Sequence, residues 1–235
     1  MIQLKTYSNT ELSKRHRRKL FLRKVTAAVF PERCPYCNKV ITPALACCID
    51  CFENFPEITY ERMAFGGYPA VSPFAYIEPY DKAIKSFKFY DNLQSAPQFA
   101  EVMAEAVKKS YSHEDFDIIT FVPLHPNRLR ERGFNQSYIL AKELSELLLI
   151  PCDELLIKTK DNPPQHKTEA KDRKKNVSGV YKAVSKDKLQ NKRILLVDDI
   201  ITSGHTLGEC ARVLVENGAT RVCCVTFATA VVKTT

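Results

Sequence analysis

RILLVDDIITSGHTLGECARVL, residues 193–214, is the stretch that decides the fold. Its aliphatic run at 194–197 predicts a buried strand, and apolar residues at helical spacing predict a helix from about 205 to 217. Asp198 and Asp199 stand between the two, although adjacent carboxylates repel each other. We expect this pair to lie where the chain leaves the sheet, facing neutral hydroxyls or a Mg²⁺ ion carried by a ligand.

The turn that follows the acidic pair has the composition of a phosphate site. Hydroxyls and closely spaced backbone N–H groups suit an anion, and the helix N-terminus adds partial positive charge. A phosphate beside a pair of hydroxyls describes a ribose 5-phosphate. The alternatives are a purely structural turn and a P-loop ATPase, which requires a Gly-Lys pair that the sequence lacks. The expected phosphate ligands are Thr202, Ser203, Gly204, His205 and Thr206.

Continuous apolar strands separated by helices fill most of the chain. Strands without alternation are typical of a parallel sheet that is buried on both faces. The sequence therefore predicts an α/β fold with a mainly parallel sheet flanked by helices. The expected strands are 117–123, 154–158, 194–197 and 221–232, and the expected helices begin near 80, 95, 135 and 205.

Two polar segments follow strands of this sheet, where ligands of α/β proteins bind. VPLHPNRLRERGFNQS, 122–137, predicts a polar loop whose arginine forks suit phosphate oxygens, with a solvated loop as the alternative. Asn135 and Gln136 are candidate caps of the next helix. The connection from 158 to 180 is long for a compact domain, which favours a lid or else disorder. The cations expected to meet a pyrophosphate are His125, Arg128, Arg130 and Arg132.

Five cysteines crowd into the segment CPYCNKVITPALACCIDC, residues 34–51. Two CxxC turns separated by ten residues can direct four thiolates at one tetrahedral Zn²⁺ ion. Four closed positions leave no place for a reactive water, so we expect the metal to be structural. Cys47 is an alternative to Cys48, because Cys47 and Cys51 lie one helical turn apart. The expected zinc ligands are Cys34, Cys37, Cys48 and Cys51.

The positive charge lies almost entirely at the N-terminus. The chain carries a net charge of +8, and residues 1–33 hold nine Lys/Arg against two Glu. A helix is expected over 12–29, and its cations indicate contact with nucleic acid or another acidic partner, with a solvated helix face as the alternative. The expected divisions are a basic helix (1–30), a zinc module (31–60) and an α/β domain (61–235). The candidate nucleic-acid ligands are Lys14, Arg15, Arg17, Arg18 and Lys19.

LLVDDIITSGHT, 195–206, resembles the phosphoribosyl-pyrophosphate motif of type I phosphoribosyltransferases. Together with the CxxC pairs, YDKAIKSFKF (80–89) and VPLHPNRLRERGFNQS, it makes residues 20–230 resemble the ComF family, ComFC-like proteins associated with natural competence. The resemblance implies a type I phosphoribosyltransferase sheet that binds phosphoribosyl pyrophosphate with Mg²⁺, and Asp198 and Asp199 as the catalytic pair at the ribose. It also implies a mobile loop containing Gln165, Arg173 and Asn176.

Two functions follow from these patterns. One, which the ComF resemblance implies, is a protein that binds phosphoribosyl pyrophosphate and handles single-stranded DNA during uptake, with a competence helicase as a further partner. The other is an active phosphoribosyltransferase of nucleotide metabolism or salvage. The chain has no apolar run of about 18 residues that would span a bilayer and no signal-peptide pattern, so we expect a cytoplasmic protein.

Overall fold

The computed structural model describes residues 31–42, 45, 47–56, 59–89, 93–161 and 179–230. The basic helix expected over 12–29, with its five candidate nucleic-acid ligands, lies outside these residues. The elements in chain order are α2 (Ile49–Glu53), β1 (Tyr60–Ala64), β2 (Tyr68–Ser72), β3 (Phe74–Ala75), α3 (Tyr80–Phe89), η1 (Leu93–Ser95), α4 (Ala96–Ser110), β4 (Ile118–Phe121), α5 (Pro126–Arg132), α6 (Gln136–Leu148), β5 (Leu156–Lys158), β6 (Tyr181–Ala183), β7 (Arg193–Ile201), α8 (His205–Glu216) and β8 (Arg221–Thr229).

The central sheet is mainly parallel, which confirms the expected architecture. Its strand order is β1-β2-β8-β7-β4, and the short β3 also pairs with β8. Only the β1–β2 pair is antiparallel, whereas β2, β3 and β7 run parallel to β8 and β4 runs parallel to β7. Because β4 and β7 run in the same direction, the segments that follow them leave the sheet at one edge.

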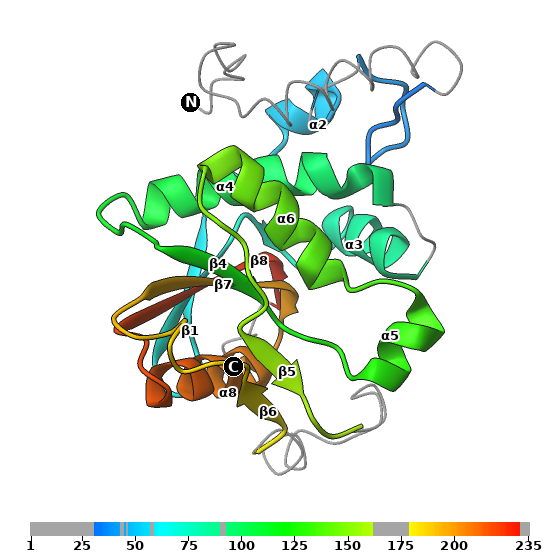
Figure 1. Cartoon of the computed structure of the whole chain (residues 1–235). Coiled ribbons are helices and arrows are strands. Elements are labelled where there is room, and N and C mark those ends of the chain that lie inside the picture. Colours follow the sequence, from blue (N-terminus) through cyan, green and yellow to red (C-terminus); the bar gives the residue numbers. More distant parts are fainter. Residues whose placement is uncertain are drawn as a thin grey trace, which may run out of the picture.

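Both faces of this sheet are buried. Leu195, Val197 and Phe227 belong to one apolar cluster, and Ile194 and Leu196 belong to another on the opposite face. Helices α3, α4 and α6 cover the first face, while α8 covers the second (Figure 1). This packing explains the unbroken apolar runs, since side chains on both sides of each strand are removed from water.

The acidic pair lies inside a strand rather than beyond its end, which corrects our expectation that the strand stops at residue 197. β7 continues to Ile201, and the register pairs Asp198 with Thr226 and Ile201 with Thr229. The strand is longer than its aliphatic run because β8 supplies backbone partners along its whole length.

The stretch 154–158 does not join the central sheet, so that expectation was wrong. The segment before β5 pairs with β4 through a single bridge, between Cys152 and Ile119. The backbone N–H of Leu155 then donates to the Thr120 hydroxyl of β4 at 3.3 Å. β5 instead forms a separate antiparallel ribbon with β6, in which Lys158 lies opposite Tyr181. The ribbon holds together the two ends of the long polar connection.

The loop expected at 122–137 contains helix α5, which is a third correction. His125 caps this helix by accepting the backbone N–H of Asn127 at 3.3 Å, and Pro126 opens its first turn. Gly133 ends the helix in the left-handed conformation, with φ 81°. The helix has only seven residues, and because most of them are charged or polar, no apolar periodicity indicated it in the sequence.

The β1–β2 hairpin was not expected from the sequence. Its turn contains Gly66 and Gly67, both at positive φ, and the N–H of Gly67 donates to the carbonyl of Ala64 at 3.0 Å. The hairpin extends the sheet beside β8 and brings Phe65 to the start of α8. None of the described helices has the length and apolar character needed to cross a membrane.

Candidate functional site

Asp198 and Asp199 lie in the part of β7 that extends beyond the aliphatic core. Asp199 is buried at 6% exposure, and Asp198 is half-buried. One oxygen of Asp198, Oδ1, accepts the Ser137 hydroxyl at 2.8 Å and the backbone N–H of Asp199 at 2.9 Å. Hydrogen bonds to an ionised carboxylate are strong, so they fix the orientation of the Asp198 side chain.

The N-terminus of α6 supplies this support. Asn135 accepts the backbone N–H groups of Ser137 and Tyr138, as expected of a helix cap, and donates its amide to the carbonyl of Val122 at 3.0 Å. The cap therefore ties α6 to the end of β4 and presents Ser137 to β7. Ser137 was not among the predicted site residues, although its place two residues after a capping Asn was a usable signal.

The turn between β7 and α8 has the open geometry of an anion site. Gly204 is the N-cap of the 12-residue α8 at φ 76°, and no described side chain caps the helix. Thr202 and Ser203 are exposed, and His205 Nδ1 lies 2.9 Å from the Ser203 hydroxyl oxygen. The N-terminus of α8 therefore lacks a cap from any described side chain, and its first N–H groups could receive an anion, as the prediction of phosphate ligands requires.

Only two of the three predicted arginines share a face of α5. Arg128 and Arg132 are one helical turn apart and half-buried, whereas Arg130 is exposed. Burial and the nearby Arg128 charge lower the pKa of Arg132, and the Asp199 carboxylate acts in the opposite direction. Arg132 therefore lies in the electrostatic field of the acidic pair, and its guanidinium also donates to Gln136 at 2.9 Å.

A lysine at the start of the predicted lid segment interacts electrostatically with the acidic pair. Lys158, at the end of β5, is half-buried, and its ammonium lies 6.0 Å from the centre of the Tyr181 ring. Burial lowers its pKa, and both Arg128 and Asp198 act on its charge. The helix α5 is tied to the same region, because Asp161 accepts the Asn127 amide at 2.7 Å and lies 3.4 Å from His125 Nδ1.

The structure thus places residues from β7, α5, α6 and β5 around one edge of the sheet. Arg130 is exposed, and its guanidinium donates to the Asn127 side chain at 2.5 Å. The predicted loop residues Gln165, Arg173 and Asn176 lie outside the described chain, so their role stays a prediction.

The four predicted zinc ligands form one cluster. The sulfur atoms of Cys34, Cys37, Cys48 and Cys51 all lie within 4.8 Å of one another, and Cys37 and Cys48 are 3.4 Å apart. In a tetrahedral site with Zn–S bonds of about 2.3 Å, sulfur atoms are roughly 3.8 Å apart. The donor set and its spacing therefore fit Zn²⁺. Cys47 is absent from this cluster of described residues and is buried at 3% exposure, which agrees with the Cys48 register.

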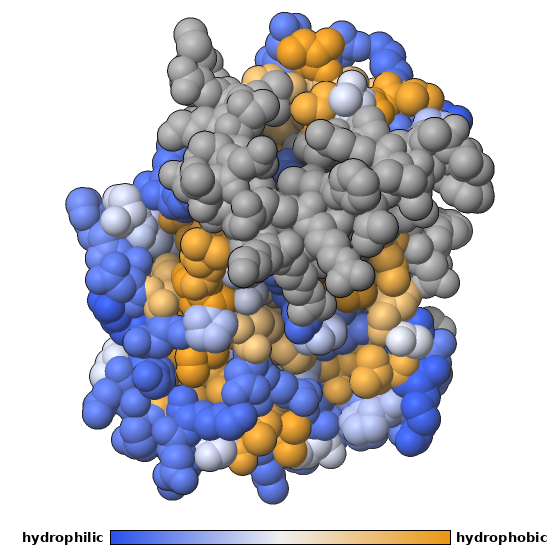
Figure 2. All heavy atoms as spheres, turned by 45° about the horizontal axis from the view of Figure 1, so that its top comes forward, coloured by the Kyte–Doolittle hydropathy of each residue, from blue (hydrophilic) through white to orange (hydrophobic). Residues whose placement is uncertain are grey.

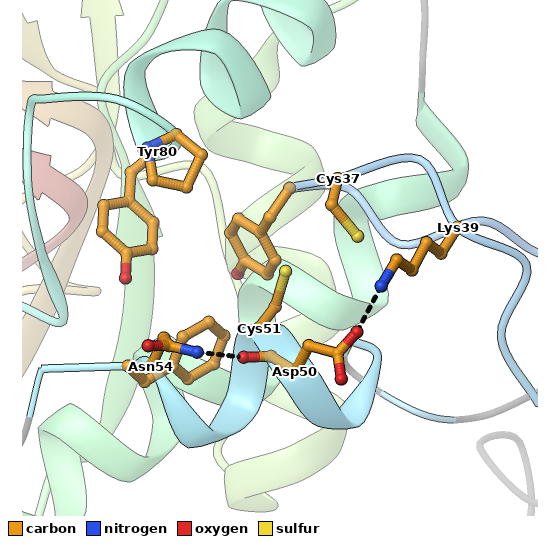
Figure 3. A pocket seen from close by; sticks show the side chains of 9 residues that line it. Cys37, Lys39, Asp50, Cys51, Asn54 and Tyr80 are labelled. Carbon is orange, nitrogen blue, oxygen red and sulfur yellow. Dashed lines mark hydrogen bonds and ion pairs between the residues drawn. The ribbon is translucent and has the colours of Figure 1, made fainter.

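Two short elements hold these thiols. A tight turn closed by the Arg33–Val40 bridge carries the first CxxC, and α2 carries the second. An exposed ion pair between Lys39 and Asp50 joins the two elements (Figure 3). Beside the cluster lies a pocket of about 260 Å³, lined by Tyr36, Cys37, Lys39, Asp50, Cys51, Asn54, Phe55, Pro79 and Tyr80.

Tyr36 anchors the cysteine cluster to the α/β core. This residue sits inside the first CxxC turn and is only 9% exposed. Its ring centre lies 5.2 Å from that of Phe55, 5.7 Å from Phe74 and 6.5 Å from Phe227 of β8. Aromatic pairs at these distances contribute about 0.5–1.5 kcal/mol each beyond burial. The metal site and the central sheet consequently share one apolar core.

We expect the zinc content to distinguish the two candidate cysteines. Cys48→Ala removes a ligand and should abolish stoichiometric zinc, whereas Cys47→Ala, the matched control, should retain about one equivalent. Metal analysis of the purified variants measures this. Because Tyr36 connects the cluster to the core, Cys48→Ala and chelation of the wild type should both lower the melting temperature of the whole domain. Retained zinc in Cys48→Ala would disprove the ligand assignment.

Comparisons with known proteins agree with this arrangement. The profile of the family described as Phosphoribosyl transferase domain matches residues 90–234. Competence protein F of Haemophilus influenzae is 30% identical over 194 residues, which cover 80% of this chain and 81% of that protein. DNA utilization protein YhgH of Escherichia coli K12 is 28% identical, with 80% of each chain covered, and Competence protein ComFC of Bacillus subtilis is 27% identical, with 84% of this chain and 75% of that protein covered.

Among solved structures, adenine phosphoribosyltransferase from Thermoanaerobacter pseudethanolicus is similar at 16% identity, with 76% of this chain and 99% of that chain covered. The TM-score is 0.37, so we base the assignment on the sequence matches. The sequence matches confirm the resemblance and the phosphoribosyltransferase-like fold. The chain belongs to the phosphoribosyl transferase domain family and, within it, to the ComF group of competence proteins.

Proposed function

We propose that this protein binds phosphoribosyl pyrophosphate together with Mg²⁺ at the edge of the sheet where β4 and β7 end, and that it acts in DNA uptake. One observation carries the binding site: the last part of β7 holds the oriented Asp198 carboxylate, and the turn that follows leads into the uncapped N-terminus of α8. The first suits ribose hydroxyls and the second suits a phosphate, so together they match both parts of a ribose 5-phosphate.

The surrounding residues suit the rest of this ligand. Asp198 and Asp199 accept the ribose hydroxyls, and the backbone of 202–206 receives the 5-phosphate. Arg128 and Arg132 face the pyrophosphate, His125 lies nearby at the start of α5, and the exposed Arg130 contributes less. Mg²⁺ bound to the ligand neutralises pyrophosphate oxygens, and carboxylates are ligands that it prefers. Lys158 adds a positive charge on the β5 side of the site.

The DNA-related part of the proposal rests on relatives and on charge. The relatives' names refer to competence and DNA utilization, and the first 33 residues carry a net +7 of the chain's +8. Such a basic segment suits single-stranded DNA. A basic segment of this kind is the part of the proposal that concerns DNA.

A protein of the uptake machinery such as a helicase is a further partner, and the exposed apolar residues of the cysteine module suit such a contact. Val40 is 59% exposed and Ile49 58%, and Figure 2 shows apolar residues among hydrophilic ones on this side of the molecule.

Catalysis is the second candidate, favoured by the presence of cations and carboxylates around one site. In the reaction, an acceptor nitrogen forms a bond to the ribose C1 as pyrophosphate leaves with the electrons of the C1–O bond. Arg132 and Lys158 would stabilise the departing charge, and the acidic pair would stabilise positive charge at the ribose. Release of pyrophosphate with candidate acceptors would establish turnover, whereas tight binding without release would leave a sensor or switch.

Replacing both carboxylates tests the ribose contact. Asp198→Asn with Asp199→Asn keeps the side-chain shapes but removes the charges, so the Kd for phosphoribosyl pyrophosphate with Mg²⁺ should rise about 100-fold or more. Calorimetry measures the affinity. Asp187→Asn, on the exposed connection that leads into β7, removes a charge outside the proposed site and serves as the control. Equal affinity for the double variant and the wild type would refute the proposal.

The two faces of α5 provide a matched pair of arginine variants. Arg132→Ala removes a half-buried cation near the acidic pair and should weaken phosphoribosyl pyrophosphate binding by about 10- to 100-fold. Arg130→Ala removes an exposed cation and should change the Kd less than about threefold. Ribose 5-phosphate, which lacks the pyrophosphate, should bind both variants as it binds the wild type. Equal losses for the two variants would contradict this arrangement.

The basic arm is tested by the salt dependence of DNA binding. Changing Lys14, Arg15, Arg17, Arg18 and Lys19 to Gln should weaken binding of a single-stranded oligonucleotide and lower the log–log salt slope by about 0.7 for each DNA phosphate that the arm no longer neutralises. Fluorescence anisotropy over a salt series measures both quantities. Lys108→Gln with Lys109→Gln, at the exposed end of α4, controls for net charge. An unchanged slope in the arm variant would show that the arm does not bind DNA.

A further inference from the structure

The turn of the β1–β2 hairpin lies directly against the start of α8. The backbone N–H of Phe65 donates to the carbonyl of Gly204 at 3.2 Å. A Cβ atom at Gly204 would lie 3.0 Å from the Cα of Ala64 and 3.1 Å from the Phe65 nitrogen. Glycine therefore suits position 204 for two reasons: the residue adopts a positive φ, and the backbone of Ala64 and Phe65 lies where a side chain would be.

Gly208, one helical turn after Gly204, lies even closer to the backbone of the hairpin turn. A Cβ atom at Gly208 would lie 2.0 Å from the carbonyl oxygen of Phe65 and 2.7 Å from its carbonyl carbon. Only a residue without a side chain fits there without a shift of the backbone. Glycine in a helix interior is unfavourable, so close packing against the hairpin explains its presence in α8.

The Phe65 side chain contacts residues 202–206, the proposed phosphate loop. Its ring stacks on the ring of His205, with centres 4.7 Å apart and planes inclined by 19°. His205 also meets Ser203, whose hydroxyl oxygen lies 2.9 Å from His205 Nδ1. Phe65 thus contacts the face of the His205 ring, and Ser203 contacts its Nδ1 atom. Together these two contacts fix the orientation of the other ring nitrogen, Nε2.

We propose that Phe65 is a positioning residue for the phosphate loop, one that acts on the ligand through His205 and the backbone of Gly204. The inference rests on the proposed function of that loop. Binding in an open turn costs conformational entropy unless the turn is already ordered. Phe65 orders residues 203–206 before the ligand arrives, through one backbone hydrogen bond and one ring stack.

The exposure of Phe65 supports a role beyond packing. Its side chain remains 48% exposed although it contacts the loop, whereas residues that only fill the core of this protein are almost completely buried. Met63, two residues earlier and 64% exposed, is the matched control, because it is a large apolar side chain of the same hairpin.

The experiment compares two ligands that report on different parts of the site. Phe65→Ala should raise the Kd for ribose 5-phosphate about tenfold and leave the Kd for Mg²⁺-pyrophosphate within about twofold, as measured by calorimetry. Phe65→Tyr keeps the flat ring and should restore wild-type affinity, and Met63→Ala should match the wild type. A general loss of folding would weaken both ligands, so a parallel loss in Phe65→Ala would overturn the positioning role.

Amide exchange without any ligand tests the same inference independently. Phe65→Ala should speed exchange at residues 203–207 relative to the wild type and Met63→Ala. Gly208→Ala should do the same and lower the melting temperature, although Gly to Ala in a helix ordinarily raises it. Unchanged exchange in both variants would overturn the inference. A wild type that fails to bind ribose 5-phosphate would refute the proposed function, while the exchange measurement would still decide whether Phe65 orders the loop.

Discussion

Backbone pairing of β7 on both sides is the constraint on which the candidate site depends. β4 pairs with the first half of this strand, through Val197, and β8 pairs with it as far as Ile201. The acidic pair is therefore carried past the apolar core on a strand that cannot shift by one residue without exchanging its two buried faces. Ser137 then adds a hydrogen bond to Asp198 from a helix cap that is itself bonded to the chain after β4. Strand register and helix capping together determine where the carboxylates lie.

The sequence predicted the elements whose signals are local. Apolar runs identified β4, β7 and β8, helical spacing identified α3, α4, α6 and α8, and two CxxC turns identified a cluster of four cysteines. It did not predict the elements whose partners are distant. β5 pairs with β6 instead of joining the central sheet, and the turn of the β1–β2 hairpin packs against α8. The same limit applied to the site, where Ser137, Lys158 and Phe65 become notable only through neighbours remote in the chain.

The cysteine module and the α/β domain are distinct in sequence but continuous in packing. Tyr36 lies between two of the clustered cysteines, and its ring belongs to the aromatic group that includes Phe74 and Phe227. Phe227 is a residue of β8, the strand that pairs with β7 beside the acidic pair. A short metal-binding segment has too little apolar surface to fold alone, and here it shares the core of its larger neighbour. This continuity gives the module a structural role in addition to any contact with a partner.

The β5–β6 ribbon has a consequence for how chains of this family diverge. By pairing Lys158 with Tyr181, the ribbon joins the two ends of the connecting segment beside the site whatever the number of residues between them. Doubling the length of a flexible closed loop costs only about 0.6 kcal/mol. Insertions and deletions can therefore accumulate in this segment while the sheet, the helices and the carboxylates stay in place. The length of this segment can therefore change at little expense to the stability of the scaffold.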